Sequence, residues 1–133
     1  MIIVDSSAWI DHLRYGNKIV EDLLYKELAC TTGIIKLEII PFLKKQHNSA
    51  SAINFLQKIS CVDIAFQPQD WNHLISYQDK LINNGLNGLG IHDLLIIHIS
   101  KITHTHGVAW AGIIEKSTLI PPSVTFTDLL IVA

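Results

Sequence analysis

The chain has 133 residues, and we predict a single domain over residues 1–133. Apolar residues make up 49% and charged residues 17%, which predicts a rich core and a thinly charged surface. The net charge of −2 excludes a protein that attracts nucleic acid through its overall charge, although local basic patches remain compatible with it.

The chain shows no targeting or cross-linking pattern. No basic stretch followed by a long apolar run opens it, and no apolar run is long enough to span a membrane, so we expect a cytosolic protein. Cys30 and Cys61 have no CxxC spacing and lie beside apolar segments, which favours two buried free thiols. The apolar surplus suggests a covered surface, with helices over 7–26 and the helix after Ser49 as candidate interfaces.

The predicted elements alternate between strands and helices. Ile2-Ile3-Val4 is a short apolar run typical of a buried strand, and Pro68 suits the first turn of a helix. Pro41 lies inside a helical pattern and should kink or shorten that helix. In chain order we predict a strand at 2–5, helices at 7–15 and 18–26, a strand at 28–31, a helix after Thr31 or Thr32, a helix from Ser49 to about 60, a strand at 61–66, a helix from Pro68 to about 84, a glycine-containing loop at 85–90, a helix opened by Asp93 and running to about 103, a strand at 108–111, and a last edge strand at 117–121 before an apolar tail. This alternation predicts an α/β fold with a parallel sheet and helices on both faces.

Three acidic residues stand in apolar surroundings. Asp5 follows the first strand, Glu38 lies in an apolar helical segment, and Asp93 precedes the run Leu94-Leu95-Ile96-Ile97. Carboxylates in such places are usually paired, capping or metal-bound. If the three converge at the carboxyl edge of the sheet, a divalent cation such as Mg²⁺ or Mn²⁺ would offset their repulsion.

Each acid also has an ordinary structural interpretation. Asp5 is a good helix cap, Asp93 would favour the dipole of its helix, and Glu38 would suit a solvated helix face beside Lys36. Residue types and spacing leave these alternatives open.

The sequence from Val4 to Arg14 resembles the opening motif of PIN-domain ribonucleases, in particular VapC-type toxins of toxin–antitoxin pairs. The segment from Thr31 to Leu43, which contains Glu38, is similar to the second acidic helix of that family. The segment from Gly90 to Ile97 is similar to its third, in which an aspartate leads an apolar helix. The order and spacing agree over about the first 100 residues.

The resemblance implies a three-layer α/β/α fold and a metal-dependent endoribonuclease that hydrolyses RNA phosphodiesters. It implies that Asp5 and Asp93 hold Mg²⁺ or Mn²⁺ and that Glu38 completes the site directly or through water. The implied partners are an RNA substrate, a cognate antitoxin and a second copy in a homodimer, with no membrane.

The chain departs from the family after the third acidic helix. The family's strand there is followed by a Thr-x-Asp element, and residues 106–115 contain none. Glu115 is the one acid in reach and joins the predicted catalytic set of Asp5, Glu38 and Asp93. The alternatives are a three-acid site, or a catalytically degenerate PIN domain that serves as a protein-binding module. A phospho-acceptor domain with Asp5 as the target is a third hypothesis, but the adjacent acid that it needs is missing.

Several other residues have two interpretations. Trp9 would stack on a base or, by its spacing with Leu13, lie in the core. The pair His104 and His106 lacks a third ligand, so we predict a solvated turn there rather than a metal site. His92 lies beside the proposed site and would contact RNA phosphate or solvent.

Overall fold

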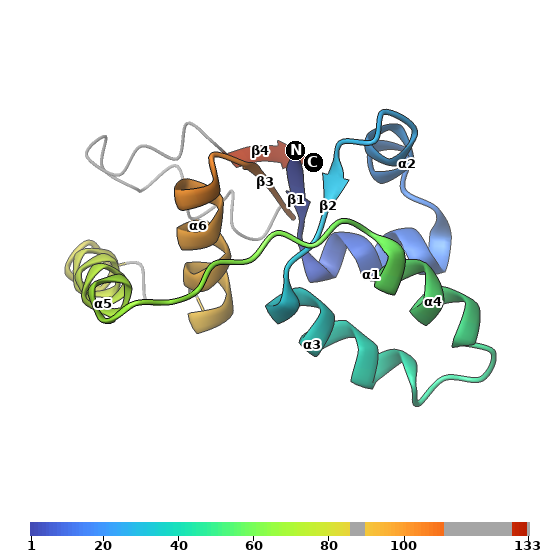
Figure 1. Cartoon of the computed structure of the whole chain (residues 1–133), viewed down its shortest axis with the longest axis horizontal. Coiled ribbons are helices and arrows are strands. Elements are labelled where there is room, and N and C mark those ends of the chain that lie inside the picture. The colour runs from blue at the N-terminus through green and yellow to red at the C-terminus, as the bar shows by residue number, and fades with distance from the viewer. Residues whose placement is uncertain (86–89, 111–128, 133) are drawn as a thin grey trace.

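A small parallel sheet forms the centre of the computed structural model, which describes residues 1–85, 90–110 and 129–132 (Figure 1). Its strands are β1 (Ile2–Val4), β2 (Ala29–Cys30), β3 (His106–Trp110) and β4 (Leu129–Val132), in the order β2-β1-β3-β4. β1 pairs in parallel with both β2 and β3, and β3 pairs in parallel with β4. Parallel pairing gathers the carboxyl ends of these strands at one edge.

Six helices occupy the described chain on either side of these strands. They are α1 (Ser6–Tyr15), α2 (Lys18–Tyr25), α3 (Gly33–Leu43), α4 (Ala50–Lys58), α5 (Pro68–Asn83) and α6 (Ile91–Thr103). Figure 1 shows α1 to α4 on one side of the strands and α5 and α6 on the other. The arrangement confirms the predicted three-layer α/β/α class.

Two apolar clusters stabilise this arrangement. The larger one joins β1 and β2 to α1 through α4 and to α6, and Trp9 lies in it with 0% of its surface exposed. The smaller one lies between α5 and α6 and consists of Leu74, Leu81 and Leu94, with partly buried residues around them. Trp9 is therefore a core residue, and base stacking by its ring is ruled out.

The chain between α4 and α5 differs from the prediction. We expected a strand over 61–66, but only Cys61 pairs, in a single parallel bridge with Thr31. Beyond it, Asp63 accepts hydrogen bonds from the backbone N–H of Gly33 at 3.0 Å and so caps α3. The segment leaves the sheet edge because its carboxylate satisfies a helix N-terminus instead of continuing the ladder.

Three smaller expectations have different outcomes. Cys30 is a buried free thiol as predicted, but Cys61 is exposed because its segment forms only that one bridge at the sheet edge. Pro41 lies inside α3, which ends two residues later at Leu43. The predicted strand at 117–121 lies outside the described residues, whereas the apolar tail forms β4, a strand that the sequence analysis did not assign.

Candidate active site

Asp5 stands where β1 ends and α1 begins. Its backbone is extended, and its side chain caps α1 by accepting a hydrogen bond from the N–H of Ser7 at 3.3 Å. The hydroxyl of Ser7 also donates to the same carboxylate oxygen. The capping role that the sequence allowed for Asp5 is thus confirmed, and Ser7 orients the carboxylate. Asp5 is half-buried at the carboxyl edge of the sheet.

Asp93 is held at the first turn of α6. Its carboxylate accepts a hydrogen bond from the backbone N–H of Gly90 at 2.9 Å, which fixes the side chain beside the helix start. Burial raises the pKa of Asp93, and the negative charges of Asp5 and Glu38 raise it further. The charges of Asp5, at the start of α1, and of Glu38, on α3, therefore both act on Asp93 at the start of α6.

Glu38 lies on α3 and is the most open of the three. Its side chain is 42% exposed, and its Oε1 lies 3.9 Å from Nδ1 of His92. Because His92 precedes Asp93, this contact joins α3 to the start of α6. In Figure 1, α1, α3 and α6 all begin on the lower side of the strands.

The acids fit a divalent cation by their chemistry but do not enclose one. Within the described residues, no group of three or more His, Cys, Asp or Glu side chains has an arrangement that would hold a metal ion as it stands. Oxygen donors that repel one another suit a hard cation, and Mg²⁺ keeps several of its waters, so it needs few direct carboxylate ligands. The donor set therefore fits a hydrated ion bound mainly by Asp5 and Asp93.

Glu115 falls outside the described residues. His104 ends α6 in a left-handed conformation, and His106 opens β3. A buried pair between Asp70 and His98 was not predicted, although an aspartate at the third position of a helix and a histidine within an apolar helix were its visible signals.

Neither a protein-family model nor a curated protein sequence matches the chain. Solved structures do match, and the resemblance extends over nearly the whole length. A chain of VapBC2 from Rickettsia felis, bound to a DNA fragment from its promoter, has a TM-score of 0.71 at 15% identity, with 99% of this chain and 98% of that chain covered.

Two further VapBC structures give the same result. DNA-bound VapBC from Salmonella typhimurium has a TM-score of 0.68 at 17% identity, covering 98% of this chain and 96% of that chain. VapBC-1 from nontypeable Haemophilus influenzae has a TM-score of 0.67 at 20% identity, covering 99% and 97%. The VapC-type PIN resemblance of the sequence is thus confirmed in its fold.

No helix in the described part of the chain has the length and apolar character needed to cross a membrane.

Proposed function

We propose that this protein is a metal-dependent endoribonuclease and the toxin of a toxin–antitoxin pair. The observation that supports this most directly is that the charges of Asp5 and Glu38 both raise the pKa of Asp93, in a fold found in VapBC complexes. Open α/β sheets place their ligands at the carboxyl edge of the sheet. In this proposal the substrate is RNA, and a second copy of the chain completes a homodimer.

The roles of the acids follow from their surroundings. Asp5 is oriented by the N–H and hydroxyl of Ser7, and Asp93 by the N–H of Gly90, so both carboxylates are held in place before any ligand arrives. These two would hold Mg²⁺ or Mn²⁺, and the more exposed Glu38 would complete the site directly or through water. When bound, the ion supplies electrostatic stabilisation of the charge that develops on the phosphodiester oxygens.

The antitoxin is the proposed regulatory partner. The structures that share this fold are VapBC complexes, and two of them are bound to DNA. We infer that this chain likewise pairs with an antitoxin, whose binding would suppress RNA cleavage.

RNA cleavage by purified protein with Mg²⁺ or Mn²⁺ tests the proposal. We expect the parent to cut RNA and Asp5→Asn to lose the activity, because the substitution removes a charged ligand while keeping the side-chain size. Asp22→Asn on the exposed face of α2 is the matched control and should cleave like the parent. A parent that cuts no RNA with either ion, in the absence of antitoxin, would leave the enzyme hypothesis without support.

The alternative of a catalytically degenerate domain has two observations in its favour. Residues 106–115 lack the Thr-x-Asp element, and the described acids do not enclose an ion. A folded protein that fails to cleave RNA but still binds an antitoxin would establish this alternative.

A further inference from the structure

Asp70 and His98 form a buried polar pair between α5 and α6. His98 Nε2 lies 3.0 Å from Asp70 Oδ1, and the two residues are 2% and 8% exposed. The second carboxylate oxygen of Asp70, Oδ2, accepts a hydrogen bond from the backbone N–H of Gln67 at 2.7 Å. One carboxylate therefore both begins α5 and joins that helix to the middle of α6.

The hydrogen bonds define the protonation of the pair. The N–H of Gln67 and then the imidazole of His98 lower the pKa of Asp70, so the carboxyl is ionised at neutral pH. An ionised carboxylate can only accept, so Nε2 of His98 must donate. In the neutral ring, Nδ1 is then a bare acceptor, and this buried atom has no partner among the described residues.

Asp70 and His98 are too deeply buried to react with a substrate directly. The imidazole stacks on Phe66 and lies beside the rings of His73 and Tyr77, with almost no surface open to solvent. A substrate cannot reach it, so its role must be to act through other residues.

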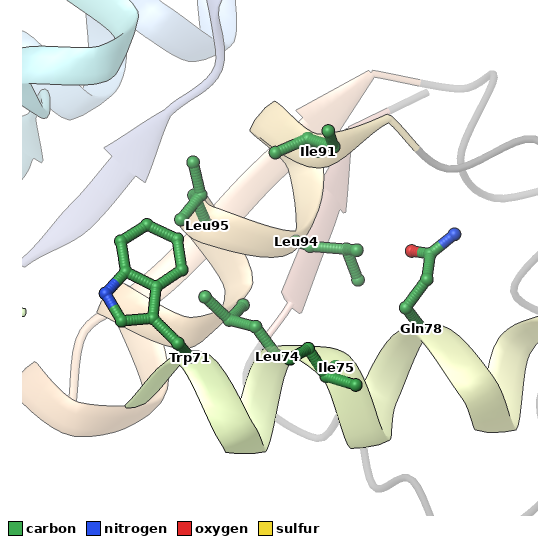
Figure 2. Close-up of a pocket in the computed structure, with 7 residues that line it drawn as sticks. All are labelled: Trp71, Leu74, Ile75, Gln78, Ile91, Leu94 and Leu95. Carbon is green, nitrogen blue, oxygen red and sulfur yellow. The ribbon is translucent and has the colours of Figure 1, made fainter. Parts of the chain in front are cut away.

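The apolar contact between the two helices is incomplete. α5 makes its main contact with α6, and their shared cluster has only three fully buried leucines. Figure 2 shows an open groove between the helices, with apolar side chains from both of them around it. The groove is lined by Trp71, Leu74, Ile75, Gln78, Ile91, Leu94 and Leu95. Because apolar contacts are not directional, this open groove does not by itself fix the orientation of α5 and α6 relative to each other.

We propose that Asp70 and His98 are positioning residues that fix α6 against α5 and thereby set the place of Asp93 relative to Asp5 and Glu38. The inference rests on the proposed function only in treating Asp93 as a metal carboxylate. Buried pairs of this kind fix geometry because leaving either partner alone in the interior is costly. Groups that orient metal-binding side chains typically change affinity by about 10–100-fold when removed.

His98→Leu and His98→Gln separate a positioning role from a packing role. The leucine fills the site but cannot donate, whereas the glutamine amide can donate to Asp70 without an ionisable ring. We expect Mn²⁺ affinity, measured by calorimetry, to fall about tenfold or more in His98→Leu and to return to within about twofold of the parent in His98→Gln. Lys101→Met removes only the exposed contact with Tyr77 and is the control, with unchanged affinity.

Two NMR measurements test the pair without metal. The ¹⁵N shifts of the parent should show the Nε2–H tautomer of His98. The amide of Gly90, which donates to Asp93, should exchange with solvent faster in His98→Leu and at the parent rate in His98→Gln. If His98→Leu does not fold, Asp70→Asn is used with the same measurements, because its amide cannot accept from both partners.

The outcomes separate the two proposals. A parent that binds no Mn²⁺ contradicts the proposed function, and amide exchange at Gly90 then decides on the pair. The positioning role is overturned by parent-like affinity and exchange in His98→Leu, by a glutamine variant that behaves like the leucine variant, or by an Nδ1–H tautomer in the parent.

Discussion

Asp93 binds its proton more tightly in the folded chain than in the unfolded chain, because burial and the charges of Asp5 and Glu38 raise its pKa above the ordinary 3.8. Between the ordinary and the raised pKa, the folded state holds more protons than the unfolded state. The free energy of unfolding therefore falls as the pH rises through that window. At neutral pH the ionised side chain destabilises the metal-free fold, which is a typical property of a site built for a cation.

Asp93→Asn should consequently raise the melting temperature of the metal-free protein at neutral pH. The asparagine oxygen still accepts from Gly90, so the capping bond is kept while the charge is lost. The difference should shrink as the pH falls through the raised pKa of Asp93, where the parent carboxyl becomes protonated. Thermal melts in a chelator across this range measure it, with Asp22→Asn as control. A variant that melts below the parent at neutral pH would show that the carboxylate is stabilising.

Adding Mn²⁺ to the same melts provides an independent result. An ion that binds only the folded state raises the melting temperature, and the rise grows with the logarithm of the ion concentration once this exceeds the Kd. We expect such a rise in the parent and none in Asp5→Asn or Asp93→Asn.

Glu115 belongs to the catalytic set predicted from the sequence, and we expect full activity to depend on it. It is the one acid near the position of the missing Thr-x-Asp, so Glu115→Gln should slow RNA cleavage by about tenfold or more while leaving the melting temperature unchanged. Cleavage rates with Mn²⁺ test this, alongside Asp5→Asn. If Glu115→Gln cuts as fast as the parent and Asp5→Asn does not cut, the site works with three acids.

At the scale of elements, the start of α3 determines where Glu38 lies. Thr32 caps this helix by accepting the N–H of Ile35 at 3.2 Å, and Asp63 accepts the N–H of Gly33. Thr31 and Thr32 are both fully buried, but the hydroxyl of Thr31 has no partner in the described part of the chain. The two threonines are thus adjacent and equally buried, but only the hydroxyl of Thr32 forms a hydrogen bond among the described residues.

Replacing each threonine by valine should therefore give opposite results. Thr32→Val keeps the shape but removes the cap, at a cost of about 1 kcal/mol in the free energy of unfolding. Thr31→Val removes an unsatisfied buried hydroxyl and should be neutral or stabilising. Urea unfolding of the two variants measures the difference. Equal destabilisation by both would mean that the hydroxyl of Thr31 has a partner in solution.

Local sequence patterns were sufficient to predict helices that begin at a capping residue. They were insufficient where a side chain forms a hydrogen bond with an element far away in the sequence. The helix starts near Ser6, Thr32 and Pro68 follow from residues that lie next to one another in sequence. The strand expected at 61–66 does not form, because Asp63 accepts a hydrogen bond from Gly33, 30 residues away. The Asp70–His98 contact spans 28 residues and has no periodicity that a local pattern would reveal.

At the scale of the whole molecule, the shared carboxyl edge of parallel strands predicts that the three acids converge, and the effect of Asp5 and Glu38 on the pKa of Asp93 supports this prediction. Their separation could not be predicted, because it depends on how α1, α3 and α6 pack. The same limit applies to the exposed apolar surface, whose existence follows from composition but whose location does not. In the structure, large apolar side chains are exposed both on α1 and α2 and on α5 and α6.

We expect the homodimer to form through α1 and α2, where Tyr15 and Tyr25 are 79% and 90% exposed. Exposed tyrosines contribute strongly when they become buried at an interface, because they bring large area with few rotatable bonds. The double variant Tyr15→Ser and Tyr25→Ser should therefore weaken dimerisation by about tenfold or more in sedimentation experiments. Leu37→Ser on α3, 73% exposed in the parent, is the matched control and should dimerise normally. A parent that stays monomeric at about 100 μM, or a double variant as dimeric as the parent, would rule out this interface.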